Sequence, residues 1–272
     1  MIIRLFSAAI VLSASQVLAA DPWADRVVSY TPGSGIGADF VTGDLYDDPS
    51  VSLGEPTRFT SDMANFGGAV TPFNSPFRAN EIVTVGGGGS LTVAFDEPVV
   101  DDPLNPFGID LLIFGNAFLF DADFPNGIAG ALASEGGIIE VSENGVDFFA
   151  VPGVEADGAF PTLGYTDTGA FSDTAGSSLT DFTLPVDPSF DLNGLDFSQI
   201  VTGYNGSGGG AGVDLATVGL SQISYVRIST AAGAQFFPEI DALADVRAVP
   251  EPISLVMAGF CLAVSFAAPR VR

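Results

Sequence analysis

The chain has 272 residues, of which 33 are acidic and eight are basic, so its formal net charge at pH 7 is −25. A field of this sign repels nucleic acid and anionic lipid headgroups, and this excludes both as electrostatic partners. The sequence contains no histidine and no lysine. Ser-His-Asp and Cys-His catalysis, histidine-ligated zinc sites and Schiff-base chemistry are therefore excluded.

The first 20 residues have the layout of a secretory signal peptide. Arg4 supplies a basic start, residues 5–11 form an apolar stretch, and residues 17–19 (Val-Leu-Ala) supply a small-residue cleavage motif, with Ala20 as the alternative end. An uncleaved membrane anchor is the competing interpretation, but the segment is too short to span a bilayer as a helix. We predict that residues 1–20 direct export and are removed.

Residues 21–247 are predicted to form one domain, a single antiparallel β-sandwich of the all-β class. Glycine, proline and phenylalanine are abundant, and short β-rich runs are separated by turn residues, without long helical periodicity. This region holds 32 of the 33 acidic residues and no cysteine, so burial or bound metal must stabilise it in place of disulfides. The predicted strands are 26–30, 81–85, 90–95, 109–114, 137–142, 146–151, 224–230 and 240–246.

Local patterns give three finer predictions. Asn144-Gly145 lies between two apolar runs and predicts a hairpin with a type I′ turn. In the run 225–228, Val226 and Ile228 are expected on one face of a strand and Arg227 on the other. The glycine-rich stretches 86–89 and 206–212 are interpreted as flexible turns, because neither has the residues of a phosphate-binding loop.

Several acidic clusters are candidate Ca²⁺ sites, since Ca²⁺ prefers carboxylate and carbonyl oxygens. The first contains Asp44, Asp47 and Asp48, which can converge on one cation or form a solvated turn. The stretch 121–127 has alternate oxygen ligands before a glycine but lacks the final glutamate of an EF-hand, and a loop without metal is favoured there. The stretch 96–103, which leads to residues 105–108, can bind Ca²⁺ or stay hydrated, and hydration is favoured.

Three motifs of the body occur in an order that resembles bacterial surface modules related to galactose-binding-like (discoidin-like) jelly rolls. They are the segment 46–54, the Val-Ser-Glu-Asn-Gly hairpin at 141–145, and the run 225–228 followed by 239–242. The resemblance implies a jelly roll whose first and last strands lie close together, with a structural Ca²⁺ in the adjoining loops. Glu239 and Asp241 would then approach the site of Asp44, Asp47 and Asp48. The tryptophan cluster usual in sugar binders is missing.

The C-terminal segment 248–272 combines a proline-flanked glutamate, an apolar stretch and a basic tail. The stretch 253–268 has no charge and spans roughly 24 Å as a helix, slightly short of a bilayer core. It can stop in a membrane with the arginines on the cytoplasmic side. The layout resembles the PEP-CTERM sorting signal, with Pro250, Glu251 and Pro252 as the tripeptide and Arg270 and Arg272 as the tail. This resemblance implies processing by an exosortase and a setting of extracellular polysaccharide; an ordinary C-terminal anchor is the alternative.

The sequence therefore predicts an exported, non-catalytic cell-surface or extracellular-matrix protein, associated with exopolysaccharide and stabilised by Ca²⁺. Its C-terminal helix would hold it in the cell envelope until that helix is cleaved, or permanently if no cleavage occurs. A carbohydrate-binding module is the alternative, with aromatic residues of the stretches 118–124 or 165–171 as its contact surface. A glycoside hydrolase is less favoured, because it needs two carboxylates about 5–10 Å apart across a cleft, and no spacing singles out such a pair.

Overall fold

The computed structural model describes residues 21–60 and 67–246. The predicted signal peptide and the C-terminal segment, including the Pro-Glu-Pro tripeptide, the apolar stretch and the two tail arginines, lie outside these residues. Within them, no helix has the length and apolar character that crossing a membrane requires.

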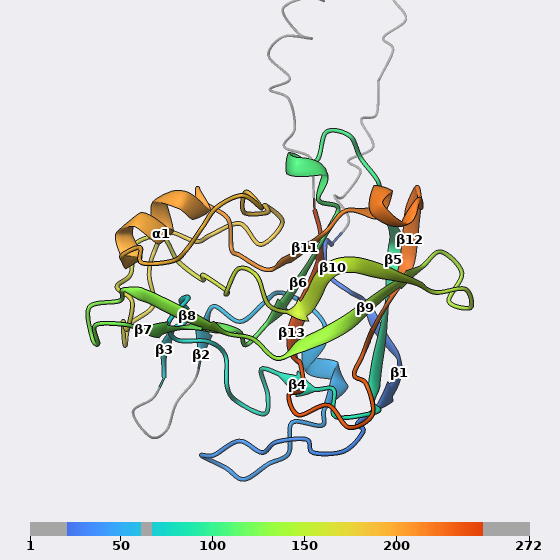
Figure 1. The fold of residues 1–272 in the computed structure, drawn as a ribbon, viewed down its shortest axis with the longest axis horizontal. Coiled ribbons are helices and arrows are strands. Elements are labelled where there is room, and N and C mark those ends of the chain that lie inside the picture. The colour runs from blue at the N-terminus through green and yellow to red at the C-terminus, as the bar shows by residue number, and fades with distance from the viewer. Residues whose placement is uncertain (1–20, 61–66, 247–272) are drawn as a thin grey trace, which may run out of the picture.

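Two antiparallel sheets form the larger part of the molecule (Figure 1). The five-stranded sheet has the order β1 (Arg26–Thr31), β5 (Ser90–Val100), β12 (Gln222–Ser229), β9 (Gly136–Ser142) and β10 (Phe149–Asp157). The four-stranded sheet has the order β11 (Ala211–Val213), β6 (Leu111–Gly115), β13 (Glu239–Asp245) and β4 (Val83–Thr84). The prediction of an antiparallel, mostly β fold is confirmed.

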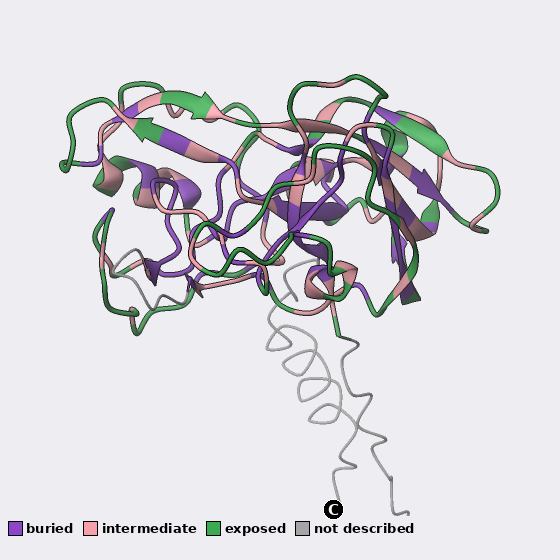
Figure 2. Ribbon diagram, turned by 90° about the horizontal axis from the view of Figure 1, so that it is seen from below, coloured by how far each residue is buried: buried purple, intermediate pink, exposed green. Residues whose placement is uncertain are grey.

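The main hydrophobic core contains side chains of both sheets. Val93 of β5 and Val226 of β12 belong to the same buried cluster as Ile113 of β6 and Leu243 of β13. Figure 2 shows buried residues along the central strands and exposed ones in the outer loops. Burial of this apolar surface stabilises the fold by roughly 25 cal/mol per Å² removed from water.

Strand β12 alternates as its sequence predicts. Val226 and Ile228 are buried, while Arg227 points to the opposite face. There its guanidinium donates two hydrogen bonds of 2.7 and 2.6 Å to the Glu140 carboxylate, on the residue that pairs with it in β9. The Arg227 guanidinium also lies 3.9 Å from the centre of the Phe148 ring.

Strand β6 is buried on both faces, which explains its continuous apolar sequence. Leu111 and Ile113 face the main core. Leu112 and Phe114 belong to a second buried cluster on the other side, where the Phe114 ring packs edge-to-face on Phe182 at 5.2 Å between centroids. A strand buried on both faces has no polar alternation.

The remaining elements form a lobe beside the sheets, at the left of Figure 1. Its core includes Phe73, Leu119, Leu163, Ile200 and Tyr204. The strands of the lobe are β2 (Phe59–Thr60), β3 (Gly68–Ala69), β7 (Phe118–Asp121) and β8 (Ala129–Ala133), and its helix is α1 (Phe197–Tyr204). Three 3-10 helices occur elsewhere in the described residues: η1 (Pro49–Ser52), η2 (Pro106–Gly108) and η3 (Leu215–Val218).

All eight predicted strands overlap observed ones, but the predicted type I′ turn is wrong. The hairpin between β9 and β10 pairs Val141 with Phe149, so its loop is longer than two residues. Gly145 has a φ of 72°, whereas Asn144 is not in the positive region that a type I′ turn requires. Instead, the Asn144 side-chain oxygen accepts hydrogen bonds from the backbone N–H groups of Val146 and Asp147.

The glycine stretch 86–89 is a hydrogen-bonded turn, which corrects the prediction that it is flexible. The backbone N–H of Gly86 donates to the Pro32 carbonyl at 2.7 Å, and that of Gly88 donates to the Thr230 carbonyl at 3.0 Å. A β-carbon on Gly89 would lie 2.6 Å from the carbonyl oxygens of Thr31 and Pro32. Glycine is needed here because three chain segments approach too closely for a side chain.

Candidate metal centre

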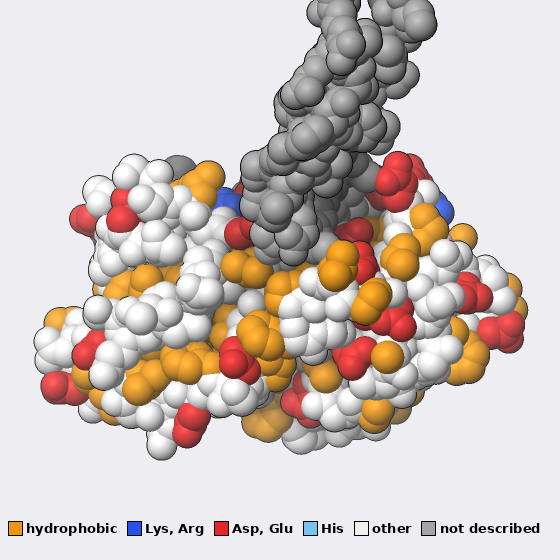
Figure 3. Space-filling model, turned by 90° about the horizontal axis from the view of Figure 1, so that it is seen from above, with side chains coloured by type: hydrophobic (Ala, Val, Ile, Leu, Met, Phe, Trp, Pro, Cys, Tyr) orange, Lys and Arg blue, Asp and Glu red, His pale blue; other side chains and the backbone are white. Residues whose placement is uncertain are grey.

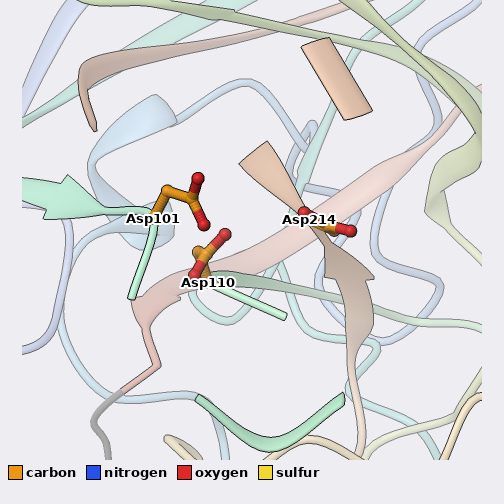
Figure 4. Close-up of side chains that lie close together, drawn as sticks. All are labelled: Asp101, Asp110 and Asp214. Atoms are coloured by element: carbon orange, nitrogen blue, oxygen red, sulfur yellow. The ribbon is translucent and has the colours of Figure 1, made fainter. Parts of the chain in front are cut away.

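Asp101, Asp110 and Asp214 meet at one end of the two sheets (Figure 4). One carboxylate oxygen of each lies within 4.8 Å of the others. Asp101 follows the last residue of β5, Asp110 precedes β6, and Asp214 follows β11. Pairing of β11 with β6 brings the last two together, with the Asp110 backbone N–H donating to the Val213 carbonyl at 2.8 Å.

The Asp110 carboxylate is fully buried at the centre of this group. One oxygen accepts hydrogen bonds from the Asn105 side-chain amide at 2.9 Å and the Asp102 backbone N–H at 3.2 Å, and the other accepts from the Leu215 backbone N–H at 3.0 Å. Burial raises the pKa of Asp110, and the negative charge of Asp101 adds to this, so the three hydrogen bonds only partly offset the rise. A bound cation would stabilise the charged form.

Asn105 lies beside the central carboxylate of this group. Its side chain is 6% exposed, and its amide nitrogen donates to Asp110. Its amide oxygen is buried and has no hydrogen-bond partner within the described residues. A buried acceptor without a donor is rare in native structures and calls for a water or an ion. The donor set, which consists only of oxygens, fits Ca²⁺.

The arginines of the described residues are engaged elsewhere. There are four, and the ion pairs they form are Arg26–Asp96, Arg58–Glu55, Arg78–Asp39 and Arg227–Glu140. On the face shown in Figure 3, acidic side chains are spread over the surface and basic ones are few. None of these arginines is paired with Asp101, Asp110 or Asp214.

The three aspartates predicted as ligands near the start of the body are exposed. Asp44 and Asp47 lie in the loop before η1. One oxygen of Asp48 accepts hydrogen bonds from the Ser50 backbone N–H at 2.9 Å and from its hydroxyl at 2.7 Å, so Asp48 caps that 3-10 helix. A local cap explains an acidic residue at this position without a metal.

The two predicted ligands of the last strand have separate surroundings. Glu239 accepts a hydrogen bond from the Thr84 hydroxyl at 3.1 Å. Asp241 is buried, and its two oxygens accept from the backbone N–H and the hydroxyl of Thr57, at 2.8 and 3.0 Å. Burial raises the pKa of Asp241 to about 8 despite these bonds.

The structure therefore does not bring the five predicted ligands together. Among the described residues, the single set of three acidic side chains within 4.8 Å of one another is the one around Asp110. Segment 44–48 does lie beside the last strand, since the Tyr46 carbonyl accepts from the Thr84 backbone N–H at 2.9 Å. Joint binding of Ca²⁺ by these five residues stays a prediction that the geometry does not support.

The acidic loop 121–127 uses its first carboxylate to organise its own backbone. The oxygens of Asp121 accept from the backbone N–H groups of Asp123, Gly127 and Ile128, each at 2.9 Å. These bonds account for the pattern of acidic residues before a glycine without a cation.

Sequence reasoning noticed Asp101 and Asn105 but missed Asp110 and Asp214. A signal for both exists: each stands between apolar residues, as Ile109-Asp110-Leu111 and Val213-Asp214-Leu215. A carboxylate in such surroundings is seldom buried unless it is paired. No protein-family model matches the chain, and no curated protein matches it in sequence.

Proposed function

We propose that the chain is an exported, non-catalytic protein of the cell surface or extracellular matrix, sorted by its C-terminal segment and associated with exopolysaccharide. The observation that carries this proposal is the order of parts in the sequence. A signal-like start precedes a body rich in β-structure, which is followed by Pro250-Glu251-Pro252, an apolar stretch and the arginines at 270 and 272. The lack of histidine and lysine supports a role without catalysis.

In this proposal, the body is a jelly-roll sandwich stabilised by Ca²⁺ at Asp101, Asp110 and Asp214. Support for the cation comes from the convergence of the three carboxylates and from the buried amide oxygen of the neighbouring Asn105, which has no hydrogen-bond partner among the described residues. Stabilisation by metal suits a domain that has no disulfide and must persist outside the cell.

The sorting proposal is tested by changing the tripeptide to alanines (Pro250→Ala, Glu251→Ala, Pro252→Ala) in a bacterial host that has an exosortase. An epitope tag inserted between residues 20 and 21 allows the protein to be detected in each cell fraction. We expect wild type at the surface or in the medium in a shortened form, and the variant at full length in the membrane fraction. The matched control is Glu143→Gln, a change of one exposed carboxylate in the body. Identical fractionation of all three proteins would refute the sorting role.

Carbohydrate binding is the second candidate, favoured by a contact between the two aromatic stretches singled out in the sequence. Phe124 is 74% exposed and Phe171 is 39% exposed, and their rings pack edge-to-face with centroids 5.2 Å apart. Exposed aromatic rings offer apolar faces to a ligand. Co-sedimentation with the host's polysaccharide should be lost in Phe124→Ala/Phe171→Ala and kept in Phe236→Ala, another exposed phenylalanine (70%). Equal binding by both variants would reject this surface.

A further inference from the structure

A groove with a volume of about 1070 Å³ lies between the lobe and the two sheets. Figure 1 shows the lobe beside the sheets, with the β7–β8 hairpin next to β9 and β10. The lobe contributes Leu119 and Leu132 of this hairpin, and the sheets contribute Leu112 of β6, Ile138 of β9 and Val151 of β10. Because strands of both parts form its walls, the groove is built by the packing of the lobe on the sheets.

The groove leaves apolar side chains uncovered. Ile138 is 48% exposed and Leu132 is 38% exposed. Val154 packs against the main core and Leu192 against the core of the lobe, and both are only partly buried. The apolar surface therefore continues from one core to the other across the groove. A connected apolar surface with a polar border is typical of a place where an apolar partner binds.

The charged side chains that line the groove are all acidic. Glu155 and Asp191 are exposed, and Asp214 lies beside the candidate metal centre. No arginine of the described residues lines the groove. The groove therefore favours an apolar occupant with positive charge next to its apolar part, and it disfavours an anionic one.

The described part of the chain stops next to this groove. Its last residue, Val246, donates its backbone N–H to the Asp110 carbonyl at 2.9 Å. Val246 also belongs to the same buried cluster as Ile109 and Leu112, and both of these residues line the groove. The residues that follow Val246 in the sequence therefore start at one end of the groove.

The C-terminal segment has the chemistry that the groove favours. The stretch 253–268 has no charge, and Arg270 and Arg272 follow it directly after one proline. The connection 247–252 can span up to about 3.5 Å per residue, so the stretch can begin anywhere within roughly 25 Å of Val246. This reach allows the stretch to enter the groove from the end formed by β6.

We propose that the stretch 253–268 docks in the groove of its own chain whenever it is not in a bilayer, with Arg270 and Arg272 beside the acidic groups. Docking removes apolar surface of both partners from water. The opposite charges of the arginines and of Glu155 and Asp191 favour one direction of the docked stretch. The groove thus covers the apolar segment in the aqueous phase and competes with a membrane for it. This inference does not depend on the proposed export, sorting or metal binding.

The test uses Cys261, the only cysteine of the chain, which lies within the stretch. A second cysteine is introduced into the full-length protein by Ile138→Cys in the groove or by Val28→Cys on β1, the edge strand at the far side of the same sheet. The two positions are matched, because Val28 is 49% exposed and Ile138 is 48% exposed. If Ile138→Cys does not fold, Leu132→Cys replaces it.

Under mild oxidation in detergent-free buffer, we expect the groove cysteine to form a disulfide with Cys261 of the same chain. It should form at least about tenfold faster than the disulfide with the Val28→Cys position, since docking raises the effective concentration of the thiol at the groove alone. Equal rates at the two positions would overturn the proposal. Disulfides between two chains in place of one would assign the groove to the segment of a neighbouring copy, and would overturn docking within the chain.

A second measurement keeps Cys261 as the only thiol. Its alkylation in the folded wild type should be at least about tenfold slower than in urea, because a docked thiol reacts only when the segment opens. Leu132→Glu/Ile138→Glu places charge in the apolar groove and should restore fast alkylation, whereas Val28→Glu should not. The same slow alkylation in the wild type and in the groove variant would mean that something other than the groove covers the segment, and would overturn the proposal.

Discussion

Asp39 and Asp241 are both buried, yet the protein stabilises their carboxyl groups in opposite ways. Asp39 accepts hydrogen bonds from the Arg78 guanidinium at 2.7 Å and from three backbone N–H groups. Burial alone would raise its pKa, but these bonds lower it to about 2. Within the described residues, Asp241 accepts hydrogen bonds from the two donors of Thr57 alone, and burial raises its pKa to about 8.

This difference reflects the small number of basic residues that can pair with buried carboxylates. The described residues include four arginines and many more carboxylates, and one of these arginines, Arg78, pairs with the deeply buried Asp39. Three other buried acidic groups, those of Asp110, Asp157 and Asp241, must rely on hydrogen-bond donors, protons or bound cations. Because the sequence contains few basic residues, several buried carboxylates of the described fold have no positively charged partner.

Removing the arginine from the buried pair should have the largest effect. We expect Arg78→Ala to lower the free energy of unfolding by about 3–5 kcal/mol, because it leaves Asp39 buried and unpaired. Arg26→Ala breaks a pair with Asp96 that is exposed on both sides, and should cost less than about 1 kcal/mol. Urea unfolding at pH 7 measures both. Equal losses would show that burial does not distinguish the two pairs.

Supplying a cation should stabilise the uncompensated groups. At a concentration 100 times its dissociation constant, Ca²⁺ bound only to the native protein adds about 2.7 kcal/mol per site. The thermal midpoint in Ca²⁺ should exceed that in EDTA by several degrees at equal ionic strength. Asp214→Asn should lose part of this gain, whereas Glu143→Gln should keep all of it. A rise no greater than NaCl produces would mean that the carboxylates bind no specific ion.

Neutralising Asp241 should remove a pH-dependent loss of stability. Its pKa is about 8 in the folded protein, against about 3.9 in the unfolded chain. The stability that its protonated form supports is therefore complete below about pH 4 and is lost as the pH rises through about 8.

Asp241→Asn keeps an oxygen for the Thr57 backbone N–H and cannot ionise. We expect it to raise the free energy of unfolding at pH 8.5 and to change it little at pH 4. About four units of pKa shift at about 1.4 kcal/mol each set an upper limit of about 5–6 kcal/mol, and relaxation around the buried charge should reduce the gain to about 1–3 kcal/mol. Urea unfolding at the two pH values provides the comparison. The same difference at both would mean that Asp241 does not titrate in this range.

A smaller effect than that of Arg78→Ala is expected where a pair is only half-buried. Arg227→Met removes the two-point hydrogen bond to Glu140 and the contact with the Phe148 ring but keeps an unbranched apolar stem. We expect a loss of about 1 kcal/mol that shrinks in 1 M NaCl, because a partly exposed pair is screened by salt. A loss as large as that of Arg78→Ala would show that exposure does not set the strength of these pairs.

The strands of the two larger sheets were predictable because their signals are local. Alternation along residues 225–228 indicates one buried face, and the apolar run 111–114 indicates a strand buried on both faces. The lobe was missed because most of residues 158–196 have no regular period. The helix Phe197–Tyr204 was not predicted because it is short, although the Asp196 and Gln199 of its capping box could have been recognised in the sequence.

The antiparallel β class, most strand positions and the shortage of basic residues could be predicted from composition and side-chain period, because neither depends on a partner segment. Which carboxylates lie close together depends on how the strands pair and pack. Asp110 and Asp214 are adjacent because β6 pairs with β11, and the Asp157 carboxylate lies near the Glu239 backbone carbonyl because Gly115 leaves room for both. Contacts between segments a hundred residues apart depend on strand pairing and packing, and no local pattern encodes either.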